Sequence, residues 1–348
     1  ENQEVIITDY EYTPLSNYFY IMKKVSVLGP IPRDHIVTHH GKTHKRYGAA
    51  LHTSIVLSKL LGDNGTVHQV SHVQKVDVEP IKNILAPYGN IETDKISSEK
   101  NQGDVVSLHF VDQNKRLEKQ TGFMPPIVPK DLAGLLDSDA FVCVPITDYE
   151  VPLETLKFIK ENSNGIIVFD AHGPTTALAA NGDRVLKFWA DRDLWLPHID
   201  VLKMNLEESR AAWYKTEYTL DELAIERLGE EHLDDFGAYC VNNGVKLLVV
   251  TLDENGAVLF YNEEGNIRKE VVPPLKVDKV IDTTGCGDSF AGGLGYGVVS
   301  HNNFALALKY ANIAGALRTQ GNTFEVFEPL EKVQHFLNNY EDVLYMKD

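Results

Sequence analysis

Residues Asp282–Gly293 read DTTGCGDSFAGG, the most informative stretch of the sequence. Its glycines at 285 and 287 let the backbone turn tightly, so that successive N–H groups can point at one spot. Apolar residues then recur at positions 290, 294 and 298, which is helical spacing. The turn is therefore predicted to lie at a helix N-terminus, where unpaired N–H groups and the helix dipole favour an anion.

The carboxylate of Asp288 lies inside the same turn. A negative charge beside an anion site is unfavourable unless it has a chemical task, and taking a proton from a hydroxyl that attacks phosphorus is such a task. The alternative is a glycine-rich helix start that only allows close packing, but two bracketing aspartates and two threonines favour the chemical interpretation. A Walker loop would need Lys-Ser/Thr after its last glycine, and Asp288-Ser289 stands there instead.

Outward from this stretch, short apolar runs alternate with amphipathic segments. The runs are continuous rather than alternating, which is typical of parallel strands covered on both faces. The apolar runs are 25–28, 67–71, 140–145, 166–170, 201–204 and 247–252, and the amphipathic segments include 49–61, 153–162 and 234–243. This rhythm predicts a doubly wound α/β sheet.

Two segments interrupt this alternation of strands and helices, and they are expected to form a small β lid at one edge of the sheet. Residues about 33–48 are polar and rich in histidine, and residues about 103–121 resemble hairpin strands with two polar faces. Residues 1–21 precede the first clear strand, so we expect them to form an N-terminal extension. Residues 22–348 are expected to form one domain.

The amino-acid composition excludes several classes of partner. The 348 residues include 33 Lys plus Arg and 50 Asp plus Glu, for a net charge of −17, which argues against nucleic acid or an anionic membrane as the main partner. No run of 18 apolar residues is present, so no membrane span is expected. The cysteines Cys143, Cys240 and Cys286 form no CxxC pair, which fits a reducing cytoplasm.

Residues 282–288 match the D-T-x-G-x-G-D signature of the ribokinase (PfkB) family of sugar and nucleoside kinases, and the chain resembles that family over nearly all of 22–340. The resemblance implies a three-layer α/β/α sandwich with a mostly parallel central sheet and a β lid. It also implies an ATP-dependent phosphotransferase with Asp288 as catalytic base. The backbone N–H groups of Gly285, Cys286 and Gly287 would stabilise the transferring phosphoryl group.

The acceptor side of the resemblance begins at residues 29–34, which read GPIPRD. In the family, an Asp five residues after such a Gly holds sugar hydroxyls, and a carboxylate can accept two hydrogen bonds from a diol. This implies that Asp34 binds the acceptor, together with lid residues such as Arg33.

The next family element, Gly-Gly followed three residues on by Asn, is altered. Gly48 matches the second glycine, but Tyr47 replaces the first and His52 stands at the Asn position. Gly48 and His52 are expected to line the acceptor pocket. Because the departures lie there, the sequence leaves the acceptor unidentified.

The segment Lys203–Glu208 resembles the N-x-x-E element of the family. Asn205 and Glu208 lie three residues apart at a helix start, so both can face one ligand. The resemblance implies that they order Mg²⁺ and its waters near the phosphates, which suits a cation that keeps several waters. The structural alternative is that Asn205 simply caps the helix.

Further elements are implied on the nucleotide side. Thr251 and Gly256 match a T-x-G-x-x-G loop in which Asp253 replaces the first glycine. Asn312 matches the Asn of the helix that lines the adenine pocket, and Gly321 matches a glycine after that helix.

Many relatives hold a monovalent cation such as K⁺ near the first Asp of the signature. The resemblance makes Asp282 and Thr284 its candidate ligands in this chain.

Several alternatives stay open at this stage. The acceptor can be a nucleoside, or the chain can be a catalytically weak binding or regulatory protein on the same fold; retention of Asp288, Asn205 and Glu208 argues against the latter. A dehydrogenase is disfavoured by the missing dinucleotide fingerprint. A lid-mediated homodimer would cover an exposed sheet edge. The histidines at 39, 40, 44 and 52 lack the regular spacing of a metal site.

Overall fold

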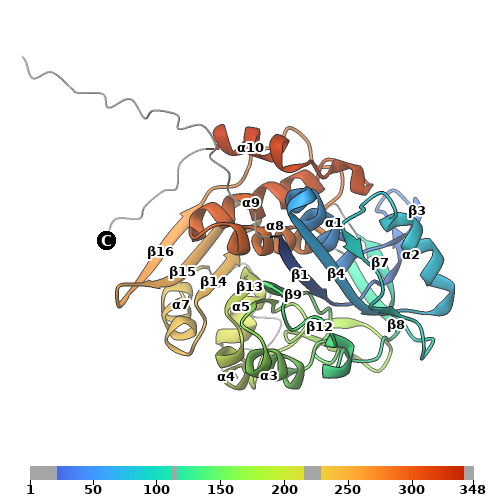
Figure 1. Ribbon diagram of the computed structural model, residues 1–348, viewed down its shortest axis with the longest axis horizontal. Coiled ribbons are helices and arrows are strands. Elements are labelled where there is room, and N and C mark those ends of the chain that lie inside the picture. Colours follow the sequence, from blue (N-terminus) through green and yellow to red (C-terminus); the bar gives the residue numbers. More distant parts are fainter. Residues whose placement is uncertain (1–21, 112–115, 215–228, 341–348) are drawn as a thin grey trace, which may run out of the picture.

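The computed structural model describes residues 22–111, 116–214 and 229–340 (Figure 1). The extension predicted for residues 1–21 and part of the second lid segment, residues 112–115, lie outside the described residues. Within the described part, no helix combines the length and the apolar character needed to cross a bilayer.

A ten-stranded sheet forms the centre of the molecule, in the order β16-β15-β14-β13-β10-β9-β1-β4-β5, with β6 also paired to β4. The pairs from β14 to β5, and the pair of β4 with β6, are parallel. At the other edge, β15 pairs with both β14 and β16 in antiparallel orientation. The strands are β1 (Lys23–Leu28), β4 (Gly65–His72), β5 (Ile91–Glu92), β6 (Ile96–Ser97), β9 (Ala140–Cys143), β10 (Ile166–Asp170), β13 (Val201–Asn205), β14 (Leu247–Thr251), β15 (Ala257–Glu263) and β16 (Asn266–Val272).

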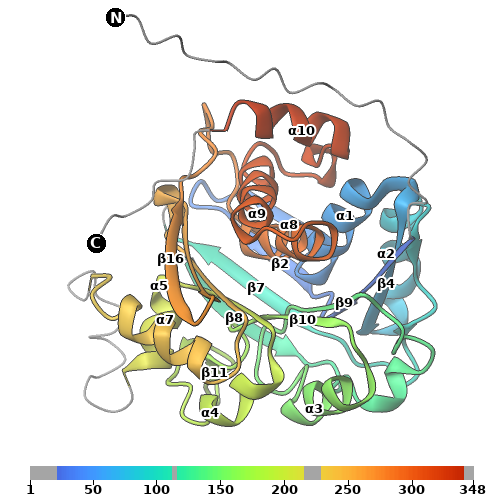
Figure 2. The ribbon, with the colours of Figure 1, turned by 60° about the vertical axis from the view of Figure 1, so that its left-hand side comes forward.

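Helices cover both faces of this sheet (Figures 1 and 2). One face carries α1 (Ala50–Leu61), α2 (Val78–Leu85), α8 (Cys286–Ser300), α9 (Phe304–Arg318) and α10 (Leu330–Asn338). The other carries α3 (Leu153–Asn162), α4 (Arg192–Trp195), α5 (Leu206–Trp213) and α7 (Leu233–Asn242). Short 3₁₀ turns lie at Gly62–Asn64, Lys75–Asp77, Pro129–Leu132, Leu196–His198, Asp253–Asn255 and Phe324–Val326.

The apolar runs of the sequence explain these layers. Every residue of β9 is buried, and so are the first four of β14, because each strand has a helix layer on both sides. Val142 and Val249 belong to the core beneath α1, α8 and α9, whereas their neighbours Phe141 and Leu248 belong to the core beneath α3 and α7. The predicted three-layer α/β/α fold is confirmed.

A separate four-stranded sheet has the order β3-β2-β7-β8. Its strands are β2 (Arg33–Val37), β3 (Thr43–Tyr47), β7 (Val105–Phe110) and β8 (Arg116–Gly122). They lie in or next to the two segments that were expected to form a small β lid. A small apolar core of Ile36, Val106, Leu108 and Phe110 stabilises it. A hairpin of β11 (Thr176–Leu178) and β12 (Arg184–Leu186) lies against β8. That this sheet acts as a lid stays a prediction.

Candidate active site

The signature turn forms the start of α8. Gly285 caps the helix in the left-handed conformation, with φ of 85° and ψ of 7°, which only glycine adopts at little cost. The N–H of Cys286 donates to the Thr283 carbonyl at 3.2 Å, and the N–H of Ser289 donates to the Gly285 carbonyl at 2.9 Å. Gly287, in the first turn of the helix, is exposed to solvent. Because helix starts present N–H groups and a positive dipole end, this turn is suited to the anion that the sequence predicts there.

The shape of the turn depends on His52 of α1. A side-chain carbon on Gly285 would lie 2.5 Å from the His52 ring, which no real contact allows. Thr53, the next residue, donates from its hydroxyl to the Asp288 carbonyl at 2.9 Å. α1 therefore holds the first turn of α8 in place, although the two helices are more than 200 residues apart in sequence.

His52 itself is fully enclosed and packs on the rings of Phe324 and Phe327. Burial first, and then the charges of Arg318 and Arg46, lower the pKa of His52 well below its ordinary value. The imidazole is therefore neutral at physiological pH.

The structure brings three of the four predicted acceptor residues together. Asp34, on β2, is buried, and a side-chain carbon on Gly48 would lie 2.6 Å from its Oδ2 atom. The same position on Gly48 lies 3.9 Å from Nε2 of His52. Between them, Ala49 has a φ of 44°, a left-handed conformation that is strained for a residue with a side chain. Asp34, Gly48 and His52 thus form one wall that reaches Gly285.

Arg33 lies outside this wall. Its guanidinium contacts Asp77 at 3.0 Å and Gln74 at 3.1 Å. Tyr47 donates its hydroxyl to Asp77 at 2.8 Å, and burial together with Asp77 raises the pKa of Tyr47 to about 12. Because adjacent residues of a strand point to opposite faces, Arg33 cannot share the face of Asp34.

A buried ammonium group faces the signature turn. Lys203, in β13, pairs with Asp170 of β10 at 2.7 Å, and both side chains are nearly inaccessible. The position of a side-chain carbon on Gly287 would lie 3.1 Å from Nζ of Lys203. Burial disfavours the charge of Lys203, but the carboxylates of Asp170, Glu208 and Asp288 outweigh it and raise its pKa above the ordinary value.

Asn205 and Glu208 form a capping box at the start of α5. The Asn205 side chain accepts from the Glu208 N–H at 2.8 Å, and Oε2 of Glu208 accepts from the Asn205 N–H at 2.8 Å. The other oxygen of Glu208 lies 2.9 Å from Nδ1 of His172. Carboxylate and amide oxygens suit Mg²⁺, but both oxygens of Glu208 are already engaged, so the cation would be held through water.

A continuous polar chain links this capping box to the small sheet. Nε2 of His172 lies 2.9 Å from Nη2 of Arg184, whose Nη1 donates to Gln120 at 2.9 Å. Gln120 in turn donates to Asp104 at 2.8 Å. Burial raises the pKa of Asp104 to about 7, and the nearby charge of Asp34 adds to the effect. The Arg33 N–H donates to the Asp104 carbonyl at 2.9 Å, which places Asp104 beside β2 and near Asp34, one of the predicted acceptor residues.

The predicted nucleotide residues are less closely grouped. The Thr251 hydroxyl lies 3.5 Å from the Met204 carbonyl, at the end of β14. Asp253, which stands where the family has glycine, has a φ of 49°, and Gly256 has a φ of 88°, so the loop keeps its left-handed positions. The Asn312 amide donates to the Pro273 carbonyl at 3.0 Å and thus ties α9 to the segment after β16.

The candidate cation ligands are surrounded by positive charge. Asp282 accepts from the Thr284 N–H at 2.9 Å through Oδ1, while Arg46 and Arg318 both contact its Oδ2 atom. Gly321 lies beside them, because its carbonyl accepts from Arg318 at 2.5 Å.

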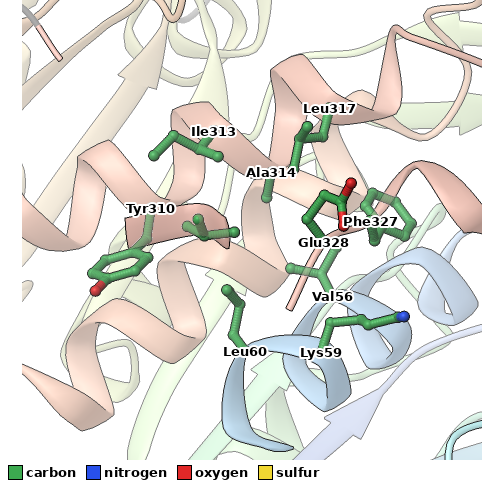
Figure 3. A pocket seen from close by; sticks show the side chains of 10 residues that line it. Val56, Lys59, Leu60, Tyr310, Ile313, Ala314, Leu317, Phe327 and Glu328 are labelled. Carbon is green, nitrogen blue, oxygen red and sulfur yellow. The ribbon is translucent and has the colours of Figure 1, made fainter. Parts of the chain in front are cut away.

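A small apolar recess lies between α1, α9, α10 and residues 327–328 (Figure 3). Side chains such as Leu60, Ile313 and Phe327 line it, and its volume is about 10 Å³, room for no more than one water. It is a packing gap next to the site and cannot hold a substrate.

Sequence reasoning missed five residues of this site: Asp104, Asp170, His172, Arg184 and Lys203. Two of them carried a usable signal, because Asp170 ends and Lys203 interrupts an apolar run that predicts a buried strand. The other three lie in polar segments where no local pattern distinguishes them from surface residues.

Comparison with known proteins supports the family resemblance. Residues 176–323 match the model of the pfkB family carbohydrate kinases. The ribokinase of Arabidopsis thaliana is 31% identical over 90 residues, which cover 26% of this chain and 23% of that protein. Fructokinase-2 of Zea mays is 43% identical over 84 residues, or 22% of this chain and 24% of the relative. Each alignment spans about a quarter of the length of the curated relative that it matches.

Likeness in three dimensions extends much further. A pyrophosphate-dependent kinase in the ribokinase family, solved with a pyrophosphate analogue and myo-inositol, superposes with a TM-score of 0.68 at 18% identity. The match covers 89% of this chain and 99% of that one. The likeness shows the ribokinase fold, and with the family match it confirms the resemblance deduced from the signature.

Proposed function

Since residues 176–323 match the pfkB carbohydrate kinases and the described chain has the ribokinase fold, we propose that this protein is an ATP-dependent kinase of a sugar or sugar-like acceptor. The observation that carries the proposal is the start of α8. There a left-handed Gly285 opens a helix, Asp288 lies in its first turn, and the ammonium of Lys203 faces Gly287. The proposed base and anion site lie in one turn of chain, and β13 brings a fixed cation next to them.

In the proposed reaction, Asp288 takes the proton of the acceptor hydroxyl. The freed oxygen forms a bond to the γ-phosphorus of ATP, the bond from that phosphorus to the β,γ-bridging oxygen breaks, and ADP leaves. The N–H groups of Gly285 and Gly287 and the ammonium of Lys203 would stabilise the charge that develops on the phosphoryl oxygens. The N–H of Cys286, also implied by the family resemblance, donates to the Thr283 carbonyl in this structure.

The acceptor would lie between the small sheet and the start of α8. Asp34, with Asp104 beside it, offers carboxylate oxygens to vicinal hydroxyls, the pattern found in sugars and cyclic polyols. The small sheet would act as a lid that keeps water away from the phosphoryl group. Mg²⁺, held through water by Asn205 and Glu208, would neutralise the phosphates of the nucleotide.

An acceptor and donor screen tests the proposal. The full chain is incubated with Mg²⁺ and either ATP or pyrophosphate, together with pentoses, hexoses, inositols and nucleosides, and phosphorylated product is measured. Transfer to a sugar or inositol from ATP is the expected result. Transfer to nucleosides alone would identify a nucleoside kinase, and acceptor binding without transfer to any acceptor would favour a binding protein on this fold.

A further inference from the structure

Two arginines meet at the first aspartate of the signature. Nη2 of Arg46 lies 2.6 Å from Oδ2 of Asp282, and Nη2 of Arg318 lies 2.9 Å from the same oxygen. The second oxygen, Oδ1, accepts the N–H of Thr284 at 2.9 Å. Both oxygens of this carboxylate are therefore occupied by donors of the chain itself.

The same arginines also occupy the backbone carbonyls of the neighbouring loop. Nη1 of Arg318 donates to the Gly321 carbonyl at 2.5 Å, and Nη1 of Arg46 donates to the Asn322 carbonyl at 3.2 Å. Arg318, the last residue of α9, is 1% exposed, and Arg46 comes from β3 of the small sheet. Three distant segments of the chain are thus joined around one carboxylate.

These contacts do not fit the monovalent cation that the family resemblance implies. Such a cation would take oxygen ligands from Asp282 and nearby carbonyls, and guanidinium groups already hold those oxygens. One carboxylate beside two guanidiniums leaves a local charge of about +1, which repels a further cation. The buried hydroxyl of Thr284, which has no hydrogen-bond partner within the described residues, is a single neutral oxygen and cannot compensate.

We infer that Arg46 and Arg318 take the place of a monovalent cation, so that fixed guanidinium charges hold the signature turn and this protein works independently of K⁺. The inference that catalysis is independent of K⁺ rests on the proposed function. The inference that folding and nucleotide binding are independent of K⁺ does not. Arg46 also gives the arrangement a second role, because it ties β3 of the small sheet to the turn that binds phosphate.

The test compares the full chain in KCl, NaCl and choline chloride at equal ionic strength. Melting temperature is measured by calorimetry, and binding of Mg·ADP is measured by titration. Both quantities are expected to be the same in the three salts. A melting temperature or an affinity that rises with K⁺ and not with choline would overturn the inference, since a bound ion stabilises the folded state by mass action.

Substitutions test whether Arg318 contributes more to the melting temperature than an arginine in an ordinary surface ion pair does. Arg318→Met is expected to lower the melting temperature and then to show stabilisation by K⁺ over choline, because the Gly321 carbonyl becomes available. Arg268→Met is the matched control, since Arg268 pairs with Glu263 at the exposed hairpin of β15 and β16. Equal melting temperatures for the two variants would contradict the assigned role of Arg318.

If Arg318→Met does not fold, Arg46→Met is compared with Arg268→Met in the same salts, because the side chain of Arg46 is less buried than that of Arg318. Failure of the proposed function is distinguishable from failure of this inference. If no acceptor is phosphorylated, the proposed kinase function is wrong. The melting temperatures and Mg·ADP affinities in the three salts would still show whether the arginines replace a monovalent cation.

Discussion

At the scale of single residues, the candidate site depends on charges that are buried and paired. Lys203 and Asp170 lie in neighbouring strands and face each other at 2.7 Å at the carboxyl edge of the sheet. A buried ion pair contributes little net stability compared with apolar residues of the same size, so stability alone does not explain the pair. Its position next to the turn proposed to bind phosphate supports a role in the proposed reaction.

Lys203→Met is expected to reduce turnover by about tenfold to a thousandfold, because an ammonium facing the phosphoryl oxygens is lost. It also leaves Asp170 as an unpaired buried charge, which costs about 3–5 kcal/mol. The double variant Lys203→Met/Asp170→Asn should regain stability but not turnover. Recovery of turnover in the double variant would show that Lys203 acts only through folding.

The neutral His52 predicts how stability depends on pH. Its pKa is well below the ordinary value of 6.5 in the folded protein, chiefly through burial, whereas the unfolded chain takes up the proton near 6.5. The unfolded state therefore binds more protons below that pH, and stability falls as the pH decreases, by up to about 1.4 kcal/mol per pH unit for one proton.

Replacing His52 with asparagine, the residue of the family pattern, removes this titration. Denaturant unfolding at a series of pH values below 6.5 should give a shallower loss of stability for His52→Asn than for the wild type. Equal slopes would mean that His52 is not buried in its neutral form.

At the scale of elements, α8 shows that close packing and chemistry coexist in one helix. Its glycines let α9 approach: a side-chain carbon on Gly297 would lie 2.4 Å from the Cα of Ala307, and one on Gly293 would lie 2.6 Å from the Tyr310 carbonyl. The packing interpretation of the glycine-rich segment therefore holds for its later turns, and the proposed anion site uses only the first.

Gly297→Ala should destabilise the protein by about 1–3 kcal/mol, because α8 and α9 would have to move apart. Gly89→Ala is the matched control, since no atom lies within 4 Å of the added carbon at that position. The free energies of unfolding in urea provide the measurement. A cost for Gly297→Ala no greater than that for Gly89→Ala would mean that the two helices are less tightly packed than described.

The sequence predicts elements better than it predicts contacts. Continuous apolar runs locate the central strands, and α3 covers 153–162, the range its amphipathic pattern predicts. The wall formed by Asp34, Gly48 and His52 lies at the positions that the family resemblance indicates, although His52 replaces the asparagine of the family pattern. The contacts of Arg33 with Asp77, and of Arg46 with Asp282, join segments far apart in the chain, and local spacing carries no information about them.

At the scale of the whole molecule, the net charge of −17 and a polyphosphate ligand are compatible. The positive groups near the turn are few and largely buried: Lys203, Arg46 and Arg318, together with the N-terminus of α8. Buried charges are screened less by salt than surface charges, so they can attract phosphate against the field of an acidic surface. The proposed site combines α1, the small sheet and α8 from opposite ends of the chain.

The proposal that Asp288 is the base of a phosphoryl transfer is tested most directly by Asp288→Asn, with Asp278→Asn, an exposed carboxylate in the same chain region, as control. Acceptor-dependent release of ADP is measured with the best acceptor of the screen, and nucleotide binding is measured in parallel. Turnover should fall about a hundredfold to ten-thousandfold in Asp288→Asn alone, with Mg·ADP binding retained. Near-normal turnover in Asp288→Asn would contradict the account.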